Sequence, residues 1–163
     1  MPLFKPYAKK EHKMMMKIFI LFAMLFIPFT ANSADGIINV ESPYNVATTT
    51  ERLEKLLNEK GMRIFNTIKH SESAAKIGVQ LRETKLIIFG NPKAGSSLMK
   101  CQPSIAIDLP QKFLIWNDEN NKVWISYNDL GYLKSRHRVK GCDELILKIG
   151  GVLASITKAA SNK

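Results

Sequence analysis

An unbroken apolar run, Leu86 to Phe89, is followed at once by Gly90, Asn91 and Pro92, and this junction constrains the fold more than any other feature of the sequence. A short apolar run bounded by turn-forming residues is typical of a strand buried inside a sheet. Glycine, asparagine and proline then end the strand and begin a turn. We therefore predict a central strand that leads into a turn-rich loop.

A helix is predicted over residues 49–60, ahead of this strand. Thr48 and Glu51 have the spacing of a capping box, in which each side chain accepts the backbone N–H of the other residue. Three leucines, at positions 53, 56 and 57, mark one apolar face, and Gly61 provides the left-handed stop. Residues 40–46 are predicted to form an edge strand that is interrupted at Pro43, because proline cannot donate to a sheet.

The apolar pattern changes to a period of two after this helix. Met62, Ile64 and Ile68 share one face of a predicted strand, with Phe65 as the exception. A short helix over residues 71–77 is then closed by a glycine. Further along, two segments of alternating character flank a polar turn, which predicts a hairpin; they are residues 113–117 and 122–127 around residues 118–121.

The C-terminal segment returns to helical spacing from Asp143 onward, although Gly150 and Gly151 weaken the middle of that helix. A sheet with one polar and one apolar face needs cover, and the two long amphipathic helices can provide it. We therefore predict an α+β two-layer sandwich, an antiparallel sheet covered by two main helices in the order strand, helix, four strands, helix.

Residues 1–34 have the layout of a secretory signal peptide: a basic stretch with lysines at positions 9, 10, 13 and 17, then the mainly apolar run from Ile18 to Phe29, then small residues up to Ala34. A membrane-spanning helix needs about 20 apolar residues, more than this run contains. Residues 35–163 are then a single domain, exported to the periplasm or secreted. The chain has a formal charge of +10, of which the first 34 residues carry +4, so the exported part keeps a basic excess of +6. That excess suits anionic ligands or acidic partners, whereas export argues against nucleic acid.

Several blocks of the sequence resemble a bacterial family, the domain of unknown function 302. They are the Phe-Gly-Asn-Pro block that ends at Pro92, the Leu-Met pair that ends at Met99, the Ile-Asp-Leu-Pro block that ends at Pro110, and the aromatic segments on either side of the predicted hairpin turn. The resemblance covers roughly residues 37–139. It implies an architecture similar to the TATA-box-binding-protein-like fold, without implying any role in DNA binding.

The loop after the central strand is the first candidate site. Gly90 and Gly95 have the glycine spacing of a phosphate-binding loop, but Ser96 stands where such a loop needs lysine. The simpler interpretation is a turn at Asn91 and Pro92, followed by a short helix that carries Met99 and is capped by Ser96 or Ser97. The start of that helix is a candidate anion-binding point.

His70, Asp108 and His137 are the candidate titratable residues, and the resemblance implies histidines at positions 70 and 137. The family more often has aspartate where this chain has Lys69, which weakens an acid–base role for His70. The structural alternatives are a helix-capping ring for His70, a turn-capping carboxylate for Asp108, and a solvated helix end for His137. A copper(I) site would combine both histidines with Met99 and Cys101, although none of these residues has ligand spacing.

Cys101 and Cys142 are the chain's two cysteines, and an exported protein meets an oxidising compartment. The sequence leaves open whether they form a disulfide.

The leading functional hypothesis is a non-enzymatic, homodimeric binding or interaction domain of the cell envelope, with no cofactor and with a small ligand or an envelope protein as partner. Its groove is expected beside residues 90–108 and His70. The candidate ligand-binding residues are His70, Gly90, Asn91, Pro92, Gly95, Ser96, Met99, Asp108 and His137. The alternative is a small metal-dependent or histidine-based enzyme that uses His70, Asp108 and His137.

Overall fold

The computed structural model describes residues 36–163, so the predicted signal peptide, residues 1–34, lies outside the described residues. The described chain forms, in order, β1 (Ile37–Ser42), α2 (Val46–Glu59), β2 (Arg63–Lys69), α3 (His70–Ala75), β3 (Thr84–Gly90), α4 (Pro92–Cys101), the 3-10 helix η1 (Pro103–Ile107), β4 (Gln111–Asn117), β5 (Val123–Asn128), α5 (Leu130–His137) and α6 (Asp143–Ser161).

The five strands form one antiparallel sheet in the order β1-β5-β4-β3-β2. The predicted central strand is β3, which pairs with β2 on one edge and with β4 on the other. The register of β2 against β3 shifts between Ile64 and Asn66, and this irregularity explains why Phe65 breaks the period of two.

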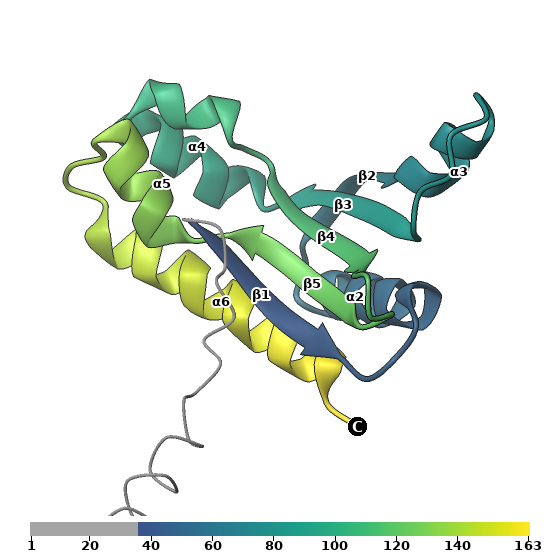
Figure 1. The fold of residues 1–163 in the computed structure, drawn as a ribbon. Coiled ribbons are helices and arrows are strands. Elements are labelled where there is room, and N and C mark those ends of the chain that lie inside the picture. The colour runs from purple at the N-terminus through teal and green to yellow at the C-terminus, as the bar shows by residue number, and fades with distance from the viewer. Residues whose placement is uncertain (1–35) are drawn as a thin grey trace, which may run out of the picture. The chain divides into compact units, whose positions relative to one another are not determined.

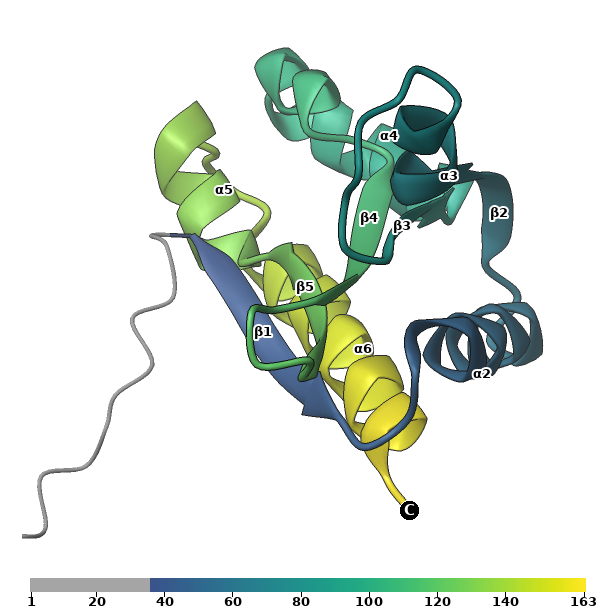
Figure 2. The ribbon, with the colours of Figure 1, turned by 45° about the vertical axis from the view of Figure 1, so that its right-hand side comes forward.

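Helices α2 and α6 contact each other and pack against the sheet, as Figures 1 and 2 show. Alternate residues of the strands face these helices: Phe113 and Ile115 of β4 and Ile125 of β5 are completely buried. Leu53 of α2 and Ile156 of α6 belong to the same core cluster. The predicted α+β two-layer sandwich is confirmed.

The N-terminal edge of the sheet and the start of α2 differ from the prediction. Strand β1 ends at Ser42, before Pro43, so proline terminates the edge strand and does not interrupt it. Helix α2 begins three residues earlier than predicted, and its cap is Asn45, whose side chain accepts the Thr48 N–H at 2.8 Å. Asparagine is among the strongest N-cap residues, and it takes the place that we assigned to Thr48.

The predicted hairpin joins β4 to β5, and Asp118 organises its turn. One carboxylate oxygen, Oδ1, accepts the backbone N–H groups of Asn120 and Lys122, and the other, Oδ2, accepts the indole N–H of Trp124 at 2.9 Å. These bonds, that of Trp124 above all, hold the pKa of Asp118 below its ordinary value.

The C-terminal helix α6 is tied to the rest of the domain at both ends. The guanidinium of Arg52 donates to the carbonyl oxygens of Ala160 and Asn162, so α2 satisfies the last carbonyls of α6. At the other end, a disulfide joins Cys101, the last residue of α4, to Cys142, which directly precedes α6. Within residues 36–163, no helix combines the length and apolar character needed to cross a membrane.

Candidate functional site

A cavity of about 700 Å³ lies between α4, α6 and the adjoining ends of the strands. Strands β2 and β3, the segment before β4 and both helices all contribute to its lining. No Asp or Glu of residues 36–163 lines it. The large apolar side chains of the lining are Met62, Phe65, Phe89, Leu98, Met99, Leu109, Leu145, Ile149, Val152 and Leu153.

Six of the nine predicted ligand-binding residues line this cavity: Gly90, Asn91, Pro92, Gly95, Ser96 and Met99. They lie together because β3 ends at Gly90 and α4 begins at Pro92, so strand end and helix start form one continuous wall. His70, Asp108 and His137 are not among the lining residues, and the predicted grouping is wrong for these three.

Helix α4 begins earlier than the sequence analysis predicts, and Asn91 is its cap instead of Ser96 or Ser97. The Asn91 carboxamide oxygen accepts the backbone N–H groups of Lys93 and Ala94 at 3.0 and 3.3 Å. Pro92 occupies the first turn, where its fixed φ favours the helix. Because Asn91 already uses two of the free N–H groups, the helix start is a poorer anion-binding point than we predicted.

Gln111 is the polar side chain that the structure adds to this site. It continues the row of core-facing positions on β4, two residues before Phe113, and only 8% of it is exposed. It also lines the cavity. Its amide nitrogen Nε2 is buried and has no hydrogen-bond partner among residues 36–163. Such a donor costs free energy unless something binds to it.

Two lysines complete the polar part of the cavity. Lys93, in the first turn of α4, and Lys148, on α6, both line it, and both are solvent-exposed residues. No ion pair with either of them occurs within the described part of the chain, whereas five other lysines pair with carboxylates; these are Lys55, Lys69, Lys85, Lys122 and Lys134.

Asp108 and His137 meet outside the cavity, in a hydrogen-bonded cluster. The imidazole Nε2 of His137 lies 2.5 Å from Asp108 Oδ2, and its Nδ1 lies 3.1 Å from the hydroxyl of Ser104. Arg136 contributes a second contact to Asp108, at 3.3 Å. His137 is 8% exposed, so the predicted solvated helix end is wrong. Leu130 and Leu133 bury the same face of α5, at the i, i+3, i+7 spacing that the sequence already contains.

Lys112 borders this cluster from β4. Its ammonium group donates to the backbone carbonyl oxygens of Asp108 and Pro110, at 3.0 and 2.8 Å. Burial lowers the pKa of Lys112, and the charge of Asp108 opposes that shift. The lysine therefore fixes the chain segment between η1 and β4.

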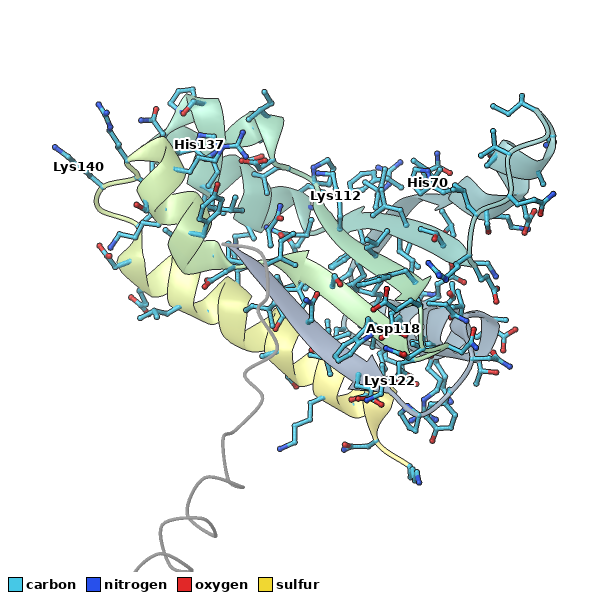
Figure 3. The ribbon with its side chains drawn as sticks, in the orientation of Figure 1. His70, Lys112, Asp118, Lys122, His137 and Lys140 are labelled. Carbon is cyan, nitrogen blue, oxygen red and sulfur yellow. A yellow bond between two sulfur atoms is a disulfide. The ribbon has the colours of Figure 1, made fainter. Side chains whose placement is uncertain are left out.

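His70 lies elsewhere, as the first residue of α3, and it is exposed. Figure 3 shows it near the junction of β2 and α3, well separated from His137 at the end of α5. The proposed copper(I) set is wrong as well, because Cys101 is bonded to Cys142 and is not a free thiolate. No three His, Cys, Asp or Glu side chains gather into a metal-binding group within residues 36–163.

Sequence reasoning missed Gln111, Lys93, Lys148 and Ser104 as site residues. A weak signal was present for Gln111, since it stands in phase with the apolar residues of β4. The lysines gave none, because an exposed lysine looks the same in sequence whether or not a cavity opens beside it.

Comparisons with known proteins agree with this description. The sequence model of the family "Domain of unknown function DUF302" matches residues 38–156. Residues of this chain are 36% identical over 121 positions to "Fluoride-specific ion channel FluC 1" of Brucella suis and to "Fluoride-specific ion channel FluC 2" of Brucella melitensis, covering 74% of this chain but 48% and 45% of those proteins. The chain thus spans about half the length of these curated relatives.

A solved structure shares the fold. The crystal structure of a DUF302 protein from Bacillus stearothermophilus superposes with a TM-score of 0.71 at 18% sequence identity, covering 78% of this chain and 99% of the other. The match of the family model over residues 38–156 establishes the family: the chain belongs to the domain of unknown function DUF302.

Proposed function

We propose that this domain binds a small, mainly apolar molecule in the cavity between α4 and α6. The cavity volume of about 700 Å³ lies within the range typical of ligand pockets, about 300–1,000 Å³. Its lining combines large apolar side chains with few polar groups, which is the usual composition of such pockets. Apolar surface that remains open in the free protein would leave water when a ligand enters, and this supplies the driving force for binding.

The observation that carries the proposal is that Gln111, a residue of the cavity lining, has a buried side-chain amide nitrogen without a hydrogen-bond partner among residues 36–163. Among core-facing positions of β4, an apolar residue would stabilise the free protein more than an unsatisfied amide does. A ligand oxygen that accepts from Nε2 would offset this cost. We therefore expect the ligand to carry a carbonyl, ester or hydroxyl oxygen within its apolar body.

Gly95 supports the same conclusion. It lies within α4, where glycine costs about 1 kcal/mol relative to alanine, and a Cβ atom at this position would meet no neighbouring atom within 4 Å. Close packing therefore does not require glycine here. A missing side chain does enlarge the cavity that Gly95 lines.

A cavity-blocking variant tests the proposal. The test uses protein expressed from the full-length chain and purified in the form that the cell produces. A neutral, environment-sensitive apolar dye should bind this protein, and its fluorescence should increase on binding. Gly95→Phe should abolish this signal by filling the cavity. Gly151→Phe is the matched control, because Gly151 also lies in a helix with open space around its Cβ position but does not line the cavity. Circular dichroism verifies that both variants fold. Equal dye binding by the two variants would refute the proposal.

A second candidate function, histidine-based ester cleavage, is favoured by the cluster of Ser104, His137 and Asp108. Their hydrogen bonds follow the Ser-His-Asp order of acyl-transfer enzymes. His137 would take the Ser104 proton while the serine oxygen attacks an ester carbonyl; the alcohol would leave with that proton, and water would then release the acid. We prefer ligand binding over ester cleavage as the function, because Ser104, His137 and Asp108 do not line the cavity that could hold a substrate. Activity on p-nitrophenyl acetate that Ser104→Ala abolishes would support this candidate, and unchanged activity would exclude it.

We also propose that the domain works in the periplasm or outside the cell. The leader-like residues 1–34 and the Cys101–Cys142 disulfide support an oxidising compartment. Fractionation of cells that express the full-length chain tests this, since recovery of an unprocessed chain from the cytosol would contradict it. Light scattering after size exclusion tests the expected homodimer.

A further inference from the structure

We infer that the molecule bound in the cavity is an anionic monoacyl lipid, with its acyl chain inside, its ester carbonyl at Gln111 and its acidic headgroup at Lys93 and Lys148. This inference rests on the proposed binding function and specifies the ligand class for the same site.

Charge selects the headgroup. Lys93 and Lys148 are the charged residues of the lining, and no Asp or Glu accompanies them there. Neither lysine has an ion-pair partner within residues 36–163, so both ammonium groups are available to an anion. They come from two different helices, α4 and α6, which allows an acidic group to interact with both walls of the cavity. A neutral headgroup would forgo this attraction.

Exposure gives the order of groups along the ligand. Gln111 is buried, at 8% exposure, whereas the two lysines are exposed. The hydrogen-bond donor therefore lies deep and the cations lie near solvent, with apolar side chains such as Phe89 and Ile149 lining the remainder. A monoacyl glycerophospholipid presents the same sequence of groups: hydrocarbon, ester carbonyl, anion. A free fatty acid carries its oxygen atoms at one end and would satisfy either Gln111 or the lysines.

Three lipids with the same palmitoyl ester distinguish these possibilities. They are lysophosphatidylglycerol, which is anionic, lysophosphatidylcholine, which is zwitterionic, and monopalmitoylglycerol, which is neutral; palmitate serves as the fourth ligand. Each displaces the bound apolar dye from the full-length protein at concentrations below its micelle threshold. We expect lysophosphatidylglycerol to bind about tenfold more tightly than either ester without net charge, as two exposed ion pairs allow. This preference should shrink as salt is added.

Lysine variants assign the effect to this site. Lys93→Gln with Lys148→Gln should remove the preference for the anion, so that lysophosphatidylglycerol and monopalmitoylglycerol bind this variant equally tightly. The matched control combines Lys100→Gln and Lys158→Gln, which remove the same charge from the same two helices at positions outside the cavity lining. The control variant should keep the preference.

The outcomes separate this inference from the proposed function. If the dye does not bind, the cavity proposal fails and the inference fails with it. If the dye binds but no lipid displaces it, the cavity proposal stands and the lipid assignment alone is overturned. If all three esters bind equally, or both lysine variants lose the preference equally, the headgroup assignment alone is overturned. If palmitate binds as tightly as lysophosphatidylglycerol, the ester contact at Gln111 is overturned. Sedimentation of the Gly95→Phe variant with phosphatidylglycerol vesicles as readily as the unmodified protein would instead assign the lysines to membrane docking.

Discussion

Replacing Gln111 by methionine should change stability and ligand binding in opposite directions. The two side chains have similar length, but methionine has no amide to leave unpaired in the core. The buried, unpartnered Nε2 of Gln111 implies that the free protein pays for this donor. Removing it should therefore stabilise the free protein, while a ligand oxygen that uses the donor loses its partner.

The size of the effect follows from the burial. An unsatisfied buried donor costs about 1–3 kcal/mol, and we take the lower half of this range because 8% of the residue remains exposed. A stabilisation of about 1–2 kcal/mol corresponds to a rise of roughly 4–8 °C in the melting temperature of a domain of this size. Binding of the ester-bearing lipid should weaken about fivefold to tenfold, the equivalent of one hydrogen bond.

The chain contains three glutamines, and the other two are matched controls. Gln102 donates its side-chain N–H to the carbonyl oxygen of His137 at 2.9 Å, so Gln102→Met should lower the melting temperature by roughly 4 °C. Gln80 is exposed in the loop before β3, so Gln80→Met should change stability by less than about 0.5 kcal/mol. Calorimetry of the three variants without ligand provides the test. If Gln111→Met is destabilised as much as Gln102→Met, the amide of Gln111 is satisfied and the reasoning is refuted.

Three further predictions concern the framework around the cavity. Cys142→Ser should lower the free energy of unfolding by roughly 4 kcal/mol, since the disulfide spans 41 positions. In the unmodified protein, two reactive thiols after unfolding without reductant would contradict the disulfide. Trp124→Phe should raise the pKa of Asp118 toward its ordinary value of 3.8, because the indole bond is the largest cause of its lowering. The stability contributed by a depressed carboxyl pKa is present at neutral pH and is lost as the pH falls through the folded-state pKa. The variant should therefore lose less stability in acid than the unmodified protein. An identical NMR titration of the Asp118 carboxyl group in both proteins would exclude the contact. Gly36→Ala should destabilise the protein, because a Cβ there would lie 2.3 Å from the ring of Tyr132 and φ is +81°; unchanged thermal unfolding would show that the ring moves freely.

The sheet and the two main helices could be predicted because local pattern and tertiary environment agree in them. The run from Leu86 to Phe89 is a buried strand, the Asp118 turn is a hairpin, and α6 forms despite two internal glycines. Helix starts were predicted less well. Asn45 and Asn91 each outcompete a Ser or Thr further along the chain, because both lie directly before a segment that can already adopt helical dihedral angles.

The site was predictable only in its backbone. Gly90 to Met99 lie against the cavity because one strand and one helix are consecutive in the chain. Asp108 and His137 come together across 29 positions, and His70 is carried away by the direction of β2, so their proximity depends on strand order. Whether an amide in the core has a partner is likewise a property of the assembled structure.

The disulfide between the end of α4 and the start of α6 has a mechanical consequence for the cavity between these helices. The disulfide links α4 and α6 covalently at one end. If the cavity widens, the two helices must move apart like a hinge, with the largest separation at the ends remote from the disulfide. An occupant would then enter from the side remote from the sulfur atoms. Because the bridged ends of α4 and α6 cannot separate, the two helices lose less conformational entropy when a ligand binds between them. This preorganisation favours tight binding with slow dissociation.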